Sequence, residues 1–282
     1  MADRRANQVA AFRQIYGRDP SSANDWRMAE VLDPHNYTPK NKGVNSNLTV
    51  GKFMPQPGRG IVAVNAFIPR SDVWNIPDRD LGDDRSFDPQ ASPESNRAII
   101  YIDYERGLIV ARQNPSVNDD GEVRVGTPVV SASEGKDGQL NIKYDFTNPY
   151  SPGGETPART LGWSVRGSVA ISGGGNPSVN GTMSNYPAVE VYGYRGAGSD
   201  PQTIYQYIPG GQSTIAAGTE YGPLLNLPLE RSVGDTSLYP QRSAPPYMVN
   251  DPYAIKPPTV YLDGTPLGSR SAPPHIGQAP SQ

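Results

Sequence analysis

The sequence predicts a mainly β protein: an antiparallel β-sandwich or partly open barrel, with two short N-terminal helices and a proline-rich C-terminal tail. Its 282 residues include 30 glycines and 30 prolines, too many helix-breaking residues for a long helical bundle. Short runs rich in β-branched and aromatic residues recur between turn-forming residues. No helical pattern separates these runs, so we expect neighbouring strands to pair antiparallel.

Residues 1–36 are expected to form a helical segment. Apolar residues share one helical face over residues 3–16, and Gly17 ends that pattern. A second helix is predicted from about residue 22 to just before Pro34. Two helices of this length bury no core between them, so we expect them to dock on the rest of the protein.

The β domain is predicted over residues 61–235, after an extended connector at 37–60 that is polar and rich in proline and glycine. The clearest hairpin is Ala98–Arg112, in which Gly107 supplies the positive φ of a tight turn. A second hairpin turns at Lys136–Gly138. Further strands are predicted at 61–69, 164–172, 178–183, 188–194 and 203–208.

The remaining residues, 236–282, form the proline-rich tail. Their apolar groups are scattered tyrosines and aliphatic residues, which cannot build a core of their own. Polyproline II or disorder is the default expectation for such a composition. A packed arm or a partner-binding segment is the alternative.

Charge and cysteine content exclude several classes of function. The net charge is −3, so no nucleic-acid partner is expected. The absence of cysteine excludes disulfides, cysteine nucleophiles, cysteine-rich zinc sites and iron–sulfur centres. No apolar run approaches the length of a transmembrane segment, and the N-terminus lacks the hydrophobic region of a signal peptide.

Motifs for catalysis are scarce, and the sequence favours a non-enzymatic protein. There are two histidines and no GxSxG motif, so a serine–histidine–aspartate triad is not expected. Asp103 and Glu105 fall on one face of a predicted strand, and paired carboxylates can act as acid and base. An ordinary solvated strand face is the default expectation for this pair. The candidate catalytic carboxylates are Asp84, Asp103 and Glu190.

The loop 78–88 contains five aspartates and two arginines. Oxygen-rich loops suit calcium, and Asp80, Asp83 and Asp84 are the candidate ligands, although the spacing is not that of an EF-hand. Neutralisation of the aspartates by the arginines of the loop is the alternative. No other cofactor is predicted.

Tyrosine is unusually common, with 16 residues against five phenylalanines. Its half-apolar, half-polar side chain suits interfaces and sugar-binding platforms. It also suits the edges of an ordinary sandwich.

Several phrases resemble an uncharacterised β-rich domain of secreted and surface proteins, chiefly of actinobacteria. They are GDDRSF at 82–87, IDYERGLIVARQNPS at 102–116, EVRVGTP at 122–128, YDFTNPYSP at 144–152 and YPAVEVY at 186–192. The opening residues resemble the segment that follows WXG-like or LXG-like regions handled by type VII secretion. The chain departs from that pattern: the helical hairpin is missing, and the one Tyr-x-x-x-Glu match, Tyr101 to Glu105, falls on a predicted strand.

The resemblance implies a secreted or cell-surface location and directs attention to polar positions within its phrases. Arg85, Asn114, Asn148 and Tyr192 are the candidate binding residues. Each asparagine precedes a proline, so hydrogen bonds that hold the adjacent turns are the alternative role.

These observations lead to three hypotheses of function. The first is an exported, non-enzymatic β domain that binds a cell-envelope glycan or a protein partner, as the C-terminal part of a type VII-type effector. The second is a carboxylate-dependent hydrolase or toxin. The third is an oligomeric structural subunit of a virion or injection-type assembly, whose arms contact neighbouring subunits.

Overall fold

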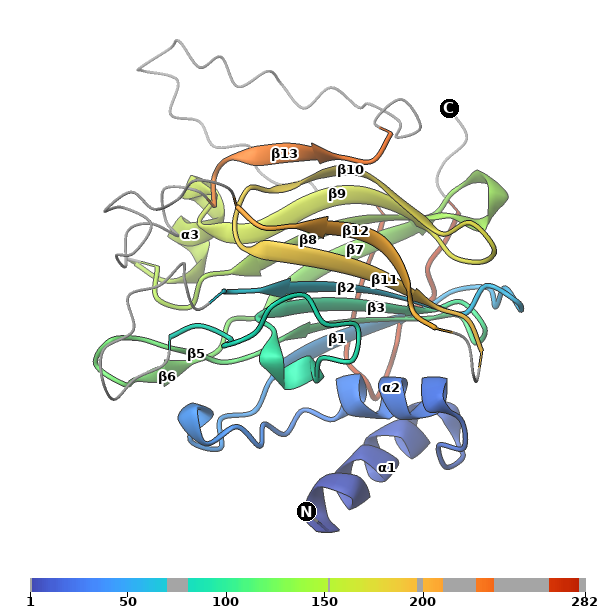
Figure 1. Ribbon diagram of the computed structural model, residues 1–282, viewed down its shortest axis with the longest axis horizontal. Helices are drawn as coiled ribbons and strands as arrows, with labels where there is room; N and C mark the ends of the chain where they lie inside the picture. Colours follow the sequence, from blue (N-terminus) through green and yellow to red (C-terminus); the bar gives the residue numbers. More distant parts are fainter. Residues whose placement is uncertain are drawn as a thin grey trace.

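Two six-stranded antiparallel sheets face each other in the computed structural model (Figure 1). The structure describes residues 2–69, 81–151, 153–196, 200–209, 227–235 and 264–278. The first sheet has the order β1 (Asn47–Lys52), β4 (Leu108–Gln113), β3 (Ala98–Asp103), β2 (Ile61–Phe67), β11 (Ala188–Tyr194) and β12 (Gln202–Tyr207). The second has the order β13 (Glu230–Val233), β10 (Ser178–Ser184), β9 (Ser164–Ser172), β8 (Leu140–Thr147), β7 (Pro128–Glu134) and β14 (Thr265–Pro266).

Smaller elements complete the described chain. A two-stranded ribbon joins β5 (Ser116–Val117) to β6 (Val123–Arg124). The helices are α1 (Ala2–Tyr16), α2 (Ala23–Leu32) and α3 (Glu155–Leu161). Short 3-10 turns lie at Pro39–Asn41, Pro93–Ser95 and Lys136–Gly138.

The mainly β, antiparallel fold with two N-terminal helices is confirmed, and the sheets form a sandwich rather than a closed barrel. Both predicted hairpins are present, as β3–β4 and β7–β8. Gly107 turns the first of them with a φ of +66°, and a Cβ at this position would collide with the carbonyl of Phe53. The hairpin therefore requires glycine there.

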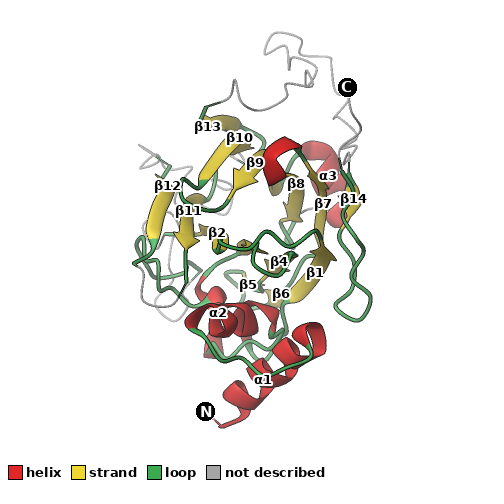
Figure 2. Cartoon of the chain, turned by 90° about the vertical axis from the view of Figure 1, so that its right-hand side faces the viewer, coloured by secondary structure: helices red, strands yellow, loops and turns green. Residues whose placement is uncertain are grey.

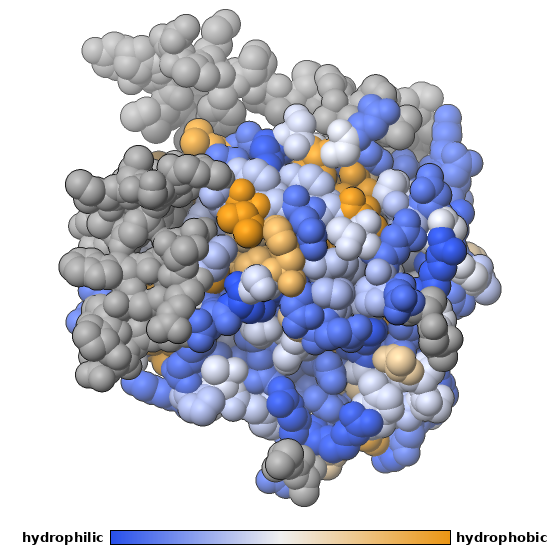
Figure 3. Space-filling view, in the orientation of Figure 1, coloured by the Kyte–Doolittle hydropathy of each residue, from blue (hydrophilic) through white to orange (hydrophobic). Residues whose placement is uncertain are grey.

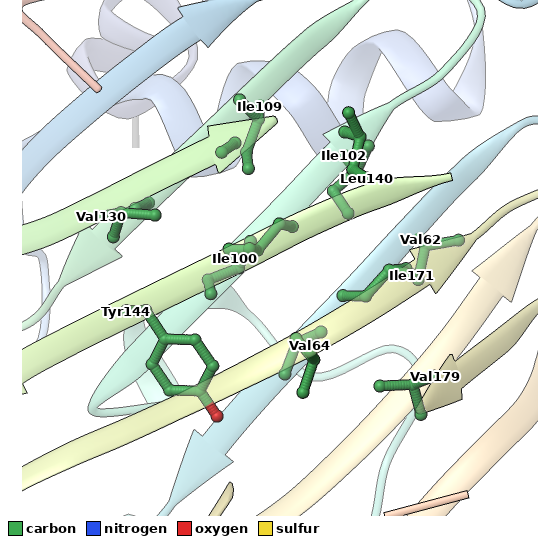
Figure 4. Packing of buried hydrophobic residues seen from close by; sticks show 14 of the residues in the cluster. Val62, Val64, Ile100, Ile102, Ile109, Val130, Leu140, Tyr144, Ile171 and Val179 are labelled. Carbon is green, nitrogen blue, oxygen red and sulfur yellow. The ribbon is translucent and has the colours of Figure 1, made fainter. Parts of the chain in front are cut away.

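The main core lies between the sheets, where side chains alternate inward along each strand. Figure 4 shows Val62, Ile100 and Ile109 of the first sheet meeting residues of the second, including Leu140 and Ile171. All five are fully or almost fully buried. This contact is the layer that holds the two sheets together.

The outer face of the first sheet is also buried, because α1 and α2 cover it (Figure 2). Phe12 of α1 and Met28 of α2 join Ile99 and Tyr101 of β3 in a second apolar cluster. The expectation that the two helices dock on the rest of the protein is confirmed. The expectation of a solvated face at Asp103 is wrong, because the helices exclude water from it.

A buried ionic cluster ties the start of α2 to the sheet. Ser22 and Asp25 cap the helix reciprocally: Ser22 Oγ accepts from Asp25 N at 3.1 Å, and Asp25 accepts from Ser22 N. Arg18 donates to Asp25 Oδ2 at 2.8 Å, and Arg106 bridges Asp25 to Asp103. Burial by itself raises the pKa of Asp25, but hydrogen bonds from Arg18 and Ser21 hold it well below its usual range.

Replacing Asp25 with asparagine should therefore lower the free energy of unfolding by about 2 kcal/mol at pH 7. The lowered pKa means that the stabilisation is present above the unfolded-state pKa of about 3.9 and is lost as the pH falls below it. The difference between variant and wild type should thus begin to shrink below about pH 5 and continue to shrink as the pH falls toward the depressed pKa of the folded state. Urea unfolding at several pH values measures it.

Asp19→Asn is the matched control, because Asp19 is exposed and pairs with exposed Arg13. At every pH tested, it should change the unfolding free energy by no more than about 0.5 kcal/mol. A difference for Asp25→Asn that stays constant from pH 7 to pH 3 would contradict a role for the ionised carboxylate.

The predicted connector contains a strand that the sequence analysis missed. β1 pairs with β4 along its whole length, from Asn47 opposite Gln113 to Lys52 opposite Leu108. Its half-exposed polar residues carry little strand signal of their own. Gly51 leaves the space that Leu267 and Ile276 occupy, so the strand is specified by tertiary packing.

Residues 264–278, called the C-terminal segment below, are packed rather than disordered. Gly268 exchanges two 2.8 Å backbone hydrogen bonds with Val50 of β1, and Leu267 N donates to Val130 O of β7. Ile276 is buried in the main core. The segment thus pairs with an edge of each sheet, beside β7 in Figure 2, and the default expectation of disorder is wrong for it. Residues 236–263 and 279–282 of the predicted tail lie outside the described residues.

Candidate functional site

Glu190, a candidate catalytic carboxylate, is fully buried on β11 beneath the loop that follows residue 81. Arg85 Nη1 lies 2.8 Å from its Oε1. The backbone N of Asp88 and the hydroxyl of Tyr192 donate to Oε2 at 3.0 and 3.1 Å. Burial raises the pKa of Glu190, and Arg85 opposes the shift. The carboxylate fixes the loop to the sheet and has no access to a substrate.

Asp103 is equally buried and also holds elements together. Its Oδ2 accepts from the hydroxyl of Tyr16 in α1 and from Arg106 Nη1, both at 3.0 Å. Burial raises the pKa of Asp103, and Arg106 opposes the shift. The third candidate, Asp84, is exposed and has a φ of +53°.

The structure does not bring Asp103 and Glu190 together. Glu190 lies opposite Asn65 of β2, which in turn lies opposite Ile99, four residues before Asp103. Strand rise and strand spacing then separate the two Cα atoms by about 16 Å. Carboxylates that hydrolyse glycosides lie within about 10 Å of each other. These two residues therefore do not form such a pair.

In its described part, the acidic loop contains no cluster of side chains that could hold a metal ion. Asp83 accepts from the backbone N of Ile68 at 2.7 Å and pairs with Arg97 at 2.9 Å. Asp84 is exposed, and Asp80 lies outside the described residues. Across the described chain, no three histidine or acidic side chains are grouped to hold a metal ion. The loop's Arg85 neutralises Glu190 rather than a neighbouring aspartate.

The remaining candidate binding residues have structural contacts. Asn114 is buried and donates to the carbonyls of Pro93 and Asn96 at 2.6 and 2.8 Å. Asn148 is half-buried and accepts from Tyr150 N at 3.0 Å, which holds a turn. Both asparagines therefore hold the adjacent backbone by hydrogen bonds, which is the alternative role predicted from the sequence. Buried Tyr192 and largely buried Arg85 contact Glu190 and present little free surface.

Apolar side chains reach the surface on the open side of the sandwich, between edge strands β12 and β13, as Met54 and Leu161 do elsewhere. Within the described ranges, no strand pairs with the outer edge of either strand. Ile208 is 44% exposed and Leu229 is 54% exposed. Figure 3 views this side and shows apolar groups in orange among polar ones. Edge strands without a partner are the usual places where another molecule docks.

Two tyrosines and an arginine lie on this side, and we call them the tyrosine–arginine platform: Tyr205, Tyr207 and Arg231. All three are half-exposed. The Arg231 guanidinium stacks 3.6 Å from the ring centroid of Tyr207, and its Nε donates to the hydroxyl of Tyr205 at 3.1 Å. Tyr207 donates its hydroxyl proton to Asn185 Oδ1 at 2.9 Å. Stacking and hydrogen bonding therefore fix the three side chains relative to one another.

Among the described residues, no acid pairs with Arg231. Its Nη1 donates to the carbonyl of Ser184, whereas Nη2 is a buried atom with no hydrogen-bond partner in that part of the chain. Neighbouring Glu230 pairs with Arg166 at 2.9 Å instead. No carboxylate of the described chain lies within 4.0 Å of the Arg231 guanidinium. The platform thus combines two half-exposed tyrosines with a positive charge that no carboxylate of the described residues pairs with.

The two tyrosines of the platform could be identified from the sequence, whereas the arginine could not. The strand predicted at 203–208 places Tyr205 and Tyr207 on one face, and it contains no charged residue that would protect an edge. Arg231 comes from β13, a short strand that the sequence analysis did not predict. Only the pairing of β13 with β10 brings the arginine to the tyrosines.

No family model matches the chain, and no curated protein matches it either. Among the described helices, none has both the length and the apolar character needed to cross a membrane.

Proposed function

We propose that the protein is an exported, non-enzymatic β domain that binds a cell-envelope glycan through the tyrosine–arginine platform. The observation that carries the proposal is the half-exposed pair of Tyr207 and Arg231, stacked 3.6 Å apart beside β12 and β13, whose outer edges have no partner strand among the described residues. Export and the envelope location are supported by the resemblance of phrases such as GDDRSF at 82–87 to secreted actinobacterial domains.

The chemistry of the platform suits sugars. A tyrosine ring offers an apolar face and a polar hydroxyl, which matches the mixed surface of a sugar ring. The guanidinium of Arg231, held against the Tyr207 ring, adds positive charge that favours an anionic or strongly polar sugar. The non-enzymatic assignment is supported by Asp103 and Glu190, which are buried, paired with arginines and far apart.

Binding to purified bacterial cell walls tests the proposal, measured by sedimentation of the protein with the insoluble wall. We expect saturable binding by the wild type. Arg231→Gln and Tyr207→Ala should each weaken it about tenfold, the equivalent of about 1.4 kcal/mol. Arg124→Gln is the matched control, because exposed Arg124 also lies over a tyrosine, Tyr150, but away from the platform.

Two results would contradict the proposal. Absence of saturable binding across walls and soluble glycans would rule out the glycan ligand. Undiminished binding by folded Arg231→Gln and Tyr207→Ala would place the ligand elsewhere on the protein.

The structural-subunit hypothesis is favoured by one observation, the C-terminal segment. Its pairing with β1 and β7 is the kind of contact that subunits exchange with their neighbours. Light scattering at high protein concentration tests it, and a strict monomer would count against it.

A further inference from the structure

We propose a second binding site, separate from the platform, in the hollow between α1, β1 and the C-terminal segment, and infer that its ligand is a small acidic sugar. The hollow has a volume of about 320 Å³. Its polar lining consists of Gln14, Ser46, Asn47, Ser269, Arg270 and Ser271. The volume is at the lower end of the ~300–1,000 Å³ typical of ligand sites, so the ligand must be small.

The lining is rich in hydroxyl and amide groups and contains no carboxylate. Ser46 already donates its hydroxyl proton to Asn114 Oδ1, and Asn47 donates through Nδ2 to Gly126 O at 3.0 Å. Both residues therefore keep a side-chain oxygen that can accept a hydrogen bond. Such a lining matches a ligand that carries several hydroxyl groups rather than an apolar one.

Arg270 gives the hollow its charge. Its Nη1 donates to Leu32 O, the carbonyl at the end of α2, at 2.6 Å, and this contact fixes the guanidinium. The other N–H groups of the guanidinium have no partner in the part of the chain that the structure describes.

Among the residues that the structure describes, no acid forms an ion pair with this guanidinium. The acidic group that acts on Arg270 is Asp33, whose carboxylate is already held by His35 Nδ1 at 2.6 Å and by the Tyr37 hydroxyl at 2.7 Å. Ion pairs in the described chain do not include Arg270. The geometry therefore leaves an arginine fork open to a ligand carboxylate, which it can bind through two hydrogen bonds.

Ligand binding and docking of the C-terminal segment are coupled in this site. Ser269, Arg270 and Ser271 belong to the segment, whereas Gln14 and Asn47 belong to the body of the protein. The hollow exists only while the segment is docked, so a ligand that contacts both walls stabilises the docked state. Local opening of the segment should become rarer when the ligand is bound.

Calorimetric titration of the full chain with digalacturonate tests the site. Digalactose is the control for a sugar without carboxylates, and acetate is the control for a carboxylate without a sugar. We expect saturable binding of digalacturonate, at least tenfold tighter than that of either control. Arg270→Gln should weaken it at least tenfold, and Arg270→Lys, which keeps the charge but loses the fork, should weaken it less. Arg231→Gln should leave this binding unchanged, which separates the site from the platform.

Hydrogen exchange provides a readout that does not depend on the affinity of a variant. The amides of Gly268 and Ile276 donate to Val50 O and Lys52 O, and their exchange should slow when digalacturonate is added. If Arg270→Gln unfolds, the double variant Ser269→Ala/Ser271→Ala, which alters two exposed side chains, replaces it and should also weaken binding.

Any of four results would overturn the inference. The first is the absence of saturable digalacturonate binding. The second and third are an affinity for digalactose, or for acetate, equal to that for digalacturonate. The fourth is wild-type affinity for digalacturonate in folded Arg270→Gln. Failure of the cell-wall experiment would leave this site unaffected, because that experiment depends on Arg231 and Tyr207.

Discussion

Replacing Arg112 with leucine is expected to lower the free energy of unfolding by about 3–5 kcal/mol, because it leaves several buried carbonyl oxygens without their charged donor. Arg112 lies on β4 and is only 1% exposed. It donates to the carbonyls of Glu30 and Asp33 at the end of α2, at 3.0 and 2.6 Å, and to Asn114 Oδ1 at 2.7 Å. Leucine would leave the two carbonyls buried without this donor, whereas Asn114 Oδ1 would keep the hydroxyl of Ser46.

The free carbonyls at the C-terminus of a helix normally meet water or a capping group. Here the sheet covers the end of α2, so Arg112 takes the place of water and its positive charge complements the helix dipole. Burial lowers the pKa of Arg112 to about 10, so the side chain remains charged at pH 7. Arg112 therefore both caps the end of α2 and helps to dock the helix on the sheet.

Urea unfolding monitored by circular dichroism measures the effect. Arg124→Leu is the control, because Arg124 is exposed and pairs only with exposed Glu122, and it should change the unfolding free energy by less than about 0.5 kcal/mol. A loss below about 1 kcal/mol for Arg112→Leu would show that the carbonyls of α2 find other donors.

The second large effect is expected for the double variant Leu267→Ala/Ile276→Ala, which should lose about 4 kcal/mol of unfolding free energy. Ile276 is buried in the main core, and Leu267 packs against that core. Both side chains fill the space that Gly51 of β1 leaves free. Their removal opens a cavity where the segment meets the two sheets.

Thermal and urea unfolding check this result, with Ser271→Ala in the same segment as the control, since Ser271 is exposed. The control should leave the midpoint unchanged. Wild-type stability in the double variant would mean that residues 264–278 contribute nothing to the folded state in solution.

Elements with strong local patterns could be predicted from the sequence. β11 begins and ends at the residues predicted, Ala188 and Tyr194, because valines alternate along it. The start of α2 follows from the cap at Ser22. The conformation of such elements follows from their own residues, so it can be predicted without knowledge of the rest of the fold.

The missed elements obtain their structure from distant partners. β1 is half-exposed and polar, and it is a strand because β4 pairs with it on one side and the C-terminal segment on the other. The proline-rich composition around residues 264–278 indicates disorder locally, but Ile276 gains burial only when both sheets are present.

The same limit applies to the candidate site. The sequence places Glu190 between two valines, which suggests a polar group on an open face. It does not show that Arg85 and the loop around it lie over that face. Spacing along a strand identifies the face of a side chain, whereas its partner depends on chain topology.

The ribosome makes the C-terminal segment after every strand from β1 to β13. While the chain is growing, the edges of β1 and β7 therefore lack the partner that later covers them, and the core lacks Ile276. Unpaired edges on a nascent chain attract other chains, so this is the stage at which chaperones have most to shield. Packing of the main core is completed only once residue 276 has emerged from the ribosome.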